Sequence, residues 1–221
     1  MWSRVSNAIA LYRAHALPLS LISAMSLPLT FTNLALFEFA PTATLLLLPL
    51  QLIVPAVVSA ALIRAIDAAL AGTQPSFSKS YELILRRLKG LVELELRYAG
   101  AFLGLLLTVI GIPWAARLLV RWFFAAQAFV IENMSPKEAI GRSCEIVQGR
   151  WWRTACMVFF PFLITAPFFI VQFLVSPPLL VDATISVLFA LFVQPVLMAY
   201  FVKLYFELRE RPILSLNAAT T

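Results

Sequence analysis

Long apolar runs alternate with short polar segments along the chain, and this pattern predicts six hydrophobic helices. The runs cover residues 16–37, 42–63, 98–112, 114–131, 154–175 and 183–205. A helix needs about 20 apolar residues to cross a bilayer. Five of the runs approach or reach that length, and the third is expected to begin earlier in the chain. Prolines inside several runs predict kinks, which membrane helices tolerate when neighbouring groups satisfy the freed carbonyls.

Three polar segments have apolar residues at helical spacing on one side and charged residues on the other. They cover residues 3–13, 77–92 and 135–148. Such amphipathic helices lie in the membrane interface. Each has a serine near its start and leads into a pair of apolar runs, which predicts three helix-hairpin repeats. We therefore expect an all-α polytopic bundle, with residues 1–211 as one transmembrane domain and residues 212–221 as a flexible C-terminal tail.

The segment between the fourth and fifth runs carries the clearest local signals. Ser135 followed three residues later by Glu138 is a capping box, with Pro136 in the first helical position, where its missing N–H costs nothing. Gly149 is suited to end the helix. The sequence thus predicts a short capped helix that connects two membrane helices.

Composition places the chain among membrane proteins. Hydrophobic residues make up 62% of the sequence and charged residues 13%, with a mean hydropathy of +0.91. Soluble domains average about 45–50% apolar and about 25% charged residues. The net charge of +6 does not indicate nucleic-acid binding, because no basic stripe with interleaved aromatics lies outside an apolar run.

The distribution of Lys and Arg predicts the orientation. The short turns at residues 38–41, 111–113 and 176–182 contain neither residue, whereas the opposite ends of the runs are rich in both. Basic residues concentrate in cytoplasmic loops. We expect six spans in the inner (plasma) membrane with both termini cytoplasmic.

Arg117 and Arg121 depart from this distribution, since they lie four residues apart on one face of the fourth run. A cation in hydrocarbon is costly and usually marks a pathway or a partner. Together with Glu132 they form a candidate intramembrane polar site. The alternative is structural: Arg121 pairs with a carbonyl or carboxylate, and Arg117 extends to the interface. A wet cavity beside Arg121 would favour the functional interpretation.

A second candidate site lies around the connector. Tryptophan side chains favour the headgroup region, and arginines beside them attract anionic lipids. The sequence predicts either a lipid-headgroup or phosphate site here or ordinary interfacial anchoring. The candidate headgroup contacts are Arg142, Arg150, Trp151, Trp152 and Arg153.

The residues do not predict catalysis. His15 is the single histidine of the chain, so a histidine-based metal site or triad cannot form within it. Glu93 and Glu95 are two residues apart and therefore lie on different faces of a helix. We expect no catalytic residue, metal or cofactor, although His15 could ligate a pigment or haem in a larger complex. Two cysteines provide no disulfide framework.

Short motifs occur along the whole chain: Leu11-Tyr12-Arg13, Gly111-Ile112-Pro113, Arg121-Trp122, Glu132, Ala139-Ile140, Arg142-Ser143, the GRWWR at 149–153 and the LYFELRER at 204–211. Together they resemble one family of six-helix integral membrane proteins, known as the membrane domain of glycerophosphoryl diester phosphodiesterase. The resemblance implies a bacterial or archaeal origin. In some relatives a soluble phosphodiesterase barrel follows this domain, and we expect none here because the chain ends at Thr221.

Three functions follow from these observations. The first is a non-catalytic accessory or scaffold subunit that packs on a larger membrane complex or organises lipid. The second is a small transporter or lipid-handling protein that uses Arg117 and Arg121 for an anionic substrate. A membrane phosphodiesterase ranks last. The expected partners are membrane lipids and a protein partner or oligomer in the membrane.

Overall fold

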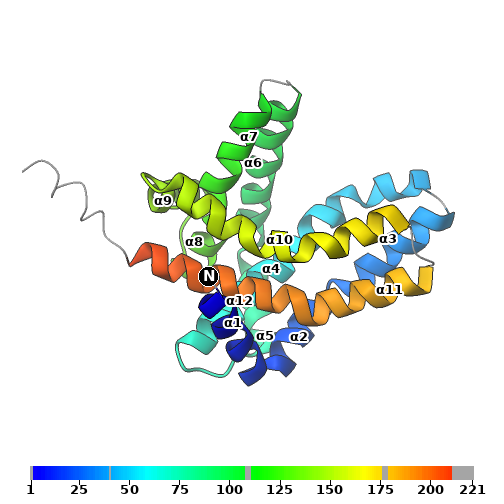
Figure 1. Ribbon diagram of the computed structural model, residues 1–221, viewed down its shortest axis with the longest axis horizontal. Coiled ribbons are helices and arrows are strands. Elements are labelled where there is room, and N and C mark those ends of the chain that lie inside the picture. The colour runs from blue at the N-terminus through cyan, green and yellow to red at the C-terminus, as the bar shows by residue number, and fades with distance from the viewer. Residues whose placement is uncertain (1, 40, 108–110, 176–178, 211–221) are drawn as a thin grey trace, which may run out of the picture.

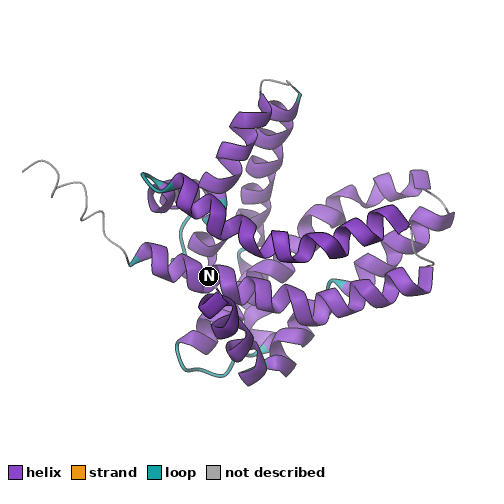
Figure 2. Cartoon of the chain, viewed as in Figure 1, coloured by secondary structure: helices purple, strands orange, loops and turns teal. Residues whose placement is uncertain are grey.

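The computed structural model describes residues 2–39, 41–107, 111–175 and 179–210, and all regular structure in these ranges is helical (Figure 2). The all-α prediction is confirmed. The predicted tail, residues 212–221, lies outside the described residues. The elements are α1 (Trp2–Ala14), α2 (Ala16–Ala24), α3 (Leu27–Phe39), the 3₁₀ helix η1 (Pro41–Leu47), α4 (Leu48–Leu70), α5 (Phe77–Arg86), α6 (Leu88–Leu106), α7 (Gly111–Trp122), α8 (Ala125–Ile131), α9 (Pro136–Val147), α10 (Trp151–Val175), α11 (Leu179–Leu188), the π-helical turn η2 (Phe189–Val193) and α12 (Gln194–Arg209).

Among the described residues, four helical segments are long and apolar enough to cross a membrane: Ala16–Leu36, Thr44–Leu70, Gly111–Ile131 and Leu180–Arg209. They overlap the first, second, fourth and sixth predicted runs, and they identify the chain as a membrane protein. The runs at 98–112 and 154–175 are not among the four, so six spans remain a prediction. The threefold repeat is also still a prediction.

Several predicted boundaries were wrong. The first run is divided at Met25 and Ser26 into α2 and α3, because Pro28 has no N–H to continue the ladder and fits the first turn of a new helix. The interfacial helix predicted over 77–92 ends at Arg86. The next helix, α6, begins at Leu88, well before the predicted start of the third run.

The fourth run also differs from its prediction. Gly111 begins α7, so residues 111–113 form the first turn of that helix instead of a connecting turn. The run is then interrupted between Trp122 and Ala125, where α7 ends and α8 begins. The cause is a hydrogen bond from α9, described below.

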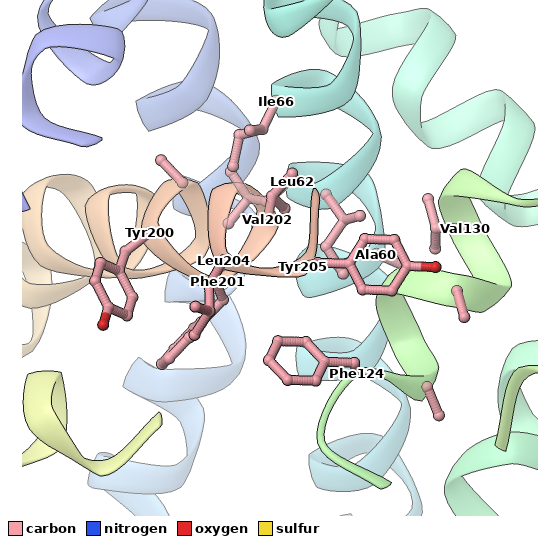
Figure 3. Packing of buried hydrophobic residues seen from close by; sticks show 14 of the residues in the cluster. Ala60, Leu62, Ile66, Phe124, Val130, Tyr200, Phe201, Val202, Leu204 and Tyr205 are labelled. Atoms are coloured by element: carbon pink, nitrogen blue, oxygen red, sulfur yellow. The ribbon is translucent and has the colours of Figure 1, made fainter. Parts of the chain in front are cut away.

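The core lies where the C-terminal half of α4, α8 and α12 meet (Figure 3). Apolar side chains outside this core are exposed instead: Leu46, Leu107, Leu163 and Leu180 are 73–82% exposed. The transfer of such apolar side chains from water into hydrocarbon is favourable. The packed core therefore organises the fold, and the exposed apolar side chains agree with the assignment as a membrane protein.

Two arms leave this core. The antiparallel pair α6 and α7 extends away from the group that contains α3, α10 and α11 (Figure 1). The segment 3–13, predicted to be an interfacial helix, is helical as part of α1, which packs on α12; its place in the interface stays a prediction. An ion pair of 2.9 Å between Arg4 and Glu207 joins them, and Lys203 Nζ donates to the Asn7 carbonyl at 2.7 Å.

Candidate functional site

The connector helix α9 begins with the predicted capping box. Ser135 N–H donates to Glu138 Oε2 at 2.9 Å, and Glu138 N–H donates to Ser135 Oγ at 3.4 Å. The first of these bonds lowers the pKa of the Glu138 carboxyl, because it stabilises the carboxylate. At the other end, Gly149 adopts a φ of +73° after α9 ends at Val147. Both predictions for this helix are confirmed, and its ends fix where α10 starts.

Ser143 of α9 bridges the interruption between α7 and α8. Its hydroxyl donates to the Arg121 carbonyl at 2.7 Å and accepts from Phe124 N–H at 3.1 Å. The side chain is fully buried. One hydroxyl thus satisfies a carbonyl and an N–H at the break, where an uninterrupted helix would pair them internally.

Replacing Ser143 with alanine is expected to lower the free energy of unfolding by about 2 kcal/mol, because two buried backbone groups lose their partner. Unfolding of the detergent-solubilised protein by sodium dodecyl sulfate measures this change. The control Ser78→Ala removes an exposed hydroxyl and should change stability by less than about 0.5 kcal/mol. Equal, small effects of both substitutions would contradict the bridging role.

A cavity of about 270 Å³ lies between α7, the end of α9 and the start of α10. Arg117 and Arg121 both line it from α7, because residues four apart lie on the same face of a helix. Both arginines are exposed, and within the described ranges neither guanidinium has a hydrogen-bond or ion-pair partner. The other lining residues are Val147, Gln148, Gly149 and Trp151.

Trp151 closes one side of this cavity, which we call the arginine cavity. Its indole Nε1 donates to the Arg117 carbonyl at 3.2 Å, which ties the start of α10 to α7. The Trp152 ring meets Trp151 edge-on, with centroids 4.6 Å apart, and is 77% exposed. An open indole beside two unpaired cations is an arrangement suited to a lipid headgroup.

Glu132 does not join Arg117 and Arg121. Its carboxylate accepts from the Tyr205 hydroxyl and from Arg142 Nε at 3.2 Å, and it lies 3.6 Å from an Arg209 nitrogen. Its side chain is 14% exposed. We call these four residues the Glu132 cluster. On α9, Arg142 contacts Glu132, whereas its neighbour Ser143 contacts the Arg121 carbonyl. The predicted polar site is therefore two sites, with Arg117 and Arg121 in one and Glu132 in the other.

The remaining candidates have different surroundings. Arg142 is committed to ion pairs with Glu132 and, at 3.3 Å, with Glu145. Arg153 is exposed and Arg150 is half-buried on either side of the tryptophan pair. His15 lies half-buried between α1 and α2.

Arg87, between α5 and α6, makes a structural contact that the sequence did not indicate. Its guanidinium donates to the carbonyls of Phe129 and Met134 at 2.9 and 2.6 Å, and it lies 4.2 Å from the centre of the Phe129 ring. These bonds hold the turn between α8 and α9.

Across the described ranges, no group of three or more His, Cys, Asp or Glu side chains is arranged to hold a metal ion. Cys144 and Cys156 are both free thiols.

Comparison with protein-family models, curated proteins and solved structures found no match to this chain. The resemblance to the glycerophosphoryl diester phosphodiesterase membrane domain therefore stays a prediction. The functional argument rests on the geometry above.

Proposed function

We propose that this is a non-catalytic integral membrane protein, with a scaffold or accessory role, that binds the phosphate headgroups of anionic lipids in the arginine cavity. The observation that carries the proposal is the pair of unpartnered arginines, Arg117 and Arg121, in one cavity beside Trp151. The proposed topology has six spans and cytoplasmic termini. It puts the junction of α9 and α10 at the cytoplasmic boundary.

The chemistry of the cavity favours an anion. The charged residues among its described lining are Arg117 and Arg121, and this lining contains no carboxylate to offset their charge. Guanidinium groups bind phosphate oxygens through paired, charge-assisted hydrogen bonds. The Gln148 amide at the cavity wall adds donors for the same oxygens. The negative charge of a lipid phosphate would offset part of the cost of holding two cations near hydrocarbon.

The size of the cavity favours a headgroup. Its volume of about 270 Å³ lies just below the range of about 300–1,000 Å³ found for whole small-molecule ligands. A phosphate with a small polar substituent fits this space, while the acyl chains would remain outside against exposed apolar side chains. Trp152, 77% exposed, is placed to contact the glycerol and upper chain region.

The test compares lipid binding by the wild type and by R117Q/R121Q in nanodiscs of phosphatidylcholine mixed with phosphatidylglycerol. Native mass spectrometry counts the lipids that stay bound. Each charge-assisted hydrogen bond contributes about 1.5–3 kcal/mol, so the double variant should bind phosphatidylglycerol at least about tenfold more weakly.

A matched control removes the same charge elsewhere. R13Q/K79Q changes two exposed cations on α1 and α5, which do not line the cavity, and it should retain the bound lipid. Equal retention by R117Q/R121Q and the wild type would contradict the proposal. An equal loss in both double variants would also contradict it, since net charge alone would then explain the binding.

A further inference from the structure

A second cavity, of about 550 Å³, lies between α4, α6, α10, α12 and the junction of α7 and α8. Its walls are mainly apolar and include Leu52, Phe102, Leu119 and Phe201. The volume falls within the range of about 300–1,000 Å³ that small-molecule sites occupy. We call it the central cavity. Gln127 and Glu95 in its wall have acceptors without a partner among the described residues, and they indicate what it binds.

Gln127 of α8 is the first of these side chains. It lines the central cavity and is 4% exposed, and its Oε1 atom has no hydrogen-bond partner among the described residues. A buried acceptor without a partner costs about 1–3 kcal/mol, and such groups are rare in native structures. A ligand that donates a hydrogen bond would remove this cost.

Glu95 of α6 is the second. Its half-buried carboxylate lines the same cavity, and in the described part of the chain it has no hydrogen-bond or ion-pair partner. Glu93, two residues earlier, pairs instead with Arg97 at 2.7 Å. Glu95 is the one charged residue among the described residues of the cavity wall. An isolated carboxylate in apolar surroundings requires a donor, and a cation satisfies it best.

An adjoining cavity has the same electrostatic character. It measures about 580 Å³, shares Gln51 with the central cavity, and has Asp182 as its charged residue among those described. Gln51 Nε2 donates to Asn33 Oδ1 at 2.7 Å where the two cavities adjoin. Thr30 and Ser186 add hydroxyls. In both cavities the charged residue among the described lining is therefore acidic, in contrast to the arginine cavity.

We propose that the central cavity binds an amphipathic amine, an aliphatic chain that ends in a primary ammonium group. The ammonium donates to the Glu95 carboxylate and to Gln127 Oε1, and the chain contacts the apolar wall. The three N–H donors on one nitrogen suit two acceptors in the wall of the same cavity, one from α6 and one from α8. This site is independent of anionic-lipid binding in the arginine cavity, because no residue lines both.

The test measures binding of three ligands with the same chain, dodecylamine, dodecanol and dodecanoate, to the protein in phosphatidylcholine nanodiscs. Native mass spectrometry of the released protein gives the affinities. The wild type should bind dodecylamine at least about tenfold more tightly than dodecanoate, since hydrogen bonds to charged groups contribute about 1.5–3 kcal/mol. E95Q keeps the shape of the side chain and should lose this preference while retaining dodecanol.

Two further variants keep the result interpretable. E93Q removes a carboxylate that does not line the cavity and should leave dodecylamine binding unchanged. Q127L should weaken dodecylamine and dodecanol together, because it removes an acceptor that both ligands use. Equal affinity of the wild type for dodecylamine and dodecanoate would overturn the proposal, as would equal binding by E95Q and E93Q. If E95Q fails to fold, the ligand series on the wild type and Q127L still decides.

Discussion

Replacement of Phe124 with alanine is expected to lower the free energy of unfolding by about 3–4 kcal/mol. Phe124 is fully buried at the break between α7 and α8 (Figure 3). Its ring packs against Tyr205 and Phe123, with centroids 6.0 and 5.3 Å apart. Removing it leaves a cavity at the point where α4, α8 and α12 meet, and surrounding helices cannot fully close it. Unfolding by sodium dodecyl sulfate, followed by circular dichroism, measures the loss.

Phe31→Ala is the matched control, because the Phe31 side chain is 43% exposed on α3. The same atoms are removed there without creating an internal cavity, so the loss should be about 1 kcal/mol or less. If the two substitutions destabilise the protein equally, the core does not lie at the junction of α4, α8 and α12.

Replacement of Glu132 with alanine is expected to cost about 2–3 kcal/mol. The carboxylate accepts hydrogen bonds from Tyr205 and Arg142 and is paired with Arg209. Removing the central anion leaves two arginines facing each other. The loss of one partner destabilises a protein by more than the intact charge cluster stabilises it, because the remaining charges are left uncompensated. The expected loss stays below the range of about 3–5 kcal/mol for fully buried pairs, because both arginine side chains are about one-third exposed.

Glu93→Ala provides the comparison for Glu132. Glu93 and Arg97 form an ion pair whose side chains are 50% and 47% exposed, and its loss should change stability by less than about 1 kcal/mol. Glu132→Gln should fall between the two, since the amide keeps one acceptor for Tyr205 but no charge. A Glu132→Ala variant as stable as Glu93→Ala would show that the Glu132 cluster does not join α8, α9 and α12.

The elements that local sequence determines were predictable. The capping box and the glycine at the end of α9 each act within a few residues, and the apolar runs exceed the length of ordinary soluble helices. The interruption at Phe124 was not predictable, because it depends on the Ser143 hydroxyl, 19 residues further along the chain. When a side chain from another helix pairs with the backbone groups at a break, the local sequence carries no pattern that predicts the break.

The same distinction applies to the candidate site. The spacing of Arg117 and Arg121 predicted that they share a face, and both line one cavity. Glu132 appeared to belong with them by proximity in sequence, but its partner Tyr205 lies 73 residues away. Contacts of that range follow from how helices pack, which composition and periodicity do not specify.

The central cavity could not be predicted for a related reason. Glu93 and Glu95 were predicted to lie on different faces of one helix, and the structure places one in an exposed ion pair and the other in the cavity wall. Which face of α6 lines a cavity depends on where α4, α8 and α12 lie in the fold. Gln127 has no sequence signal at all, since an amide within an apolar run is usually satisfied by its neighbours.

The most direct measurement uses a photo-crosslinking amino acid at Gln148, which lines the arginine cavity. Illumination in membranes that contain both phosphatidylglycerol and phosphatidylcholine, followed by mass spectrometry, identifies the lipid attached. The account predicts a phosphatidylglycerol adduct that is lost when R117Q/R121Q is introduced and retained with R13Q/K79Q. Adducts with both lipids in proportion to their abundance, unchanged by R117Q/R121Q, would contradict it.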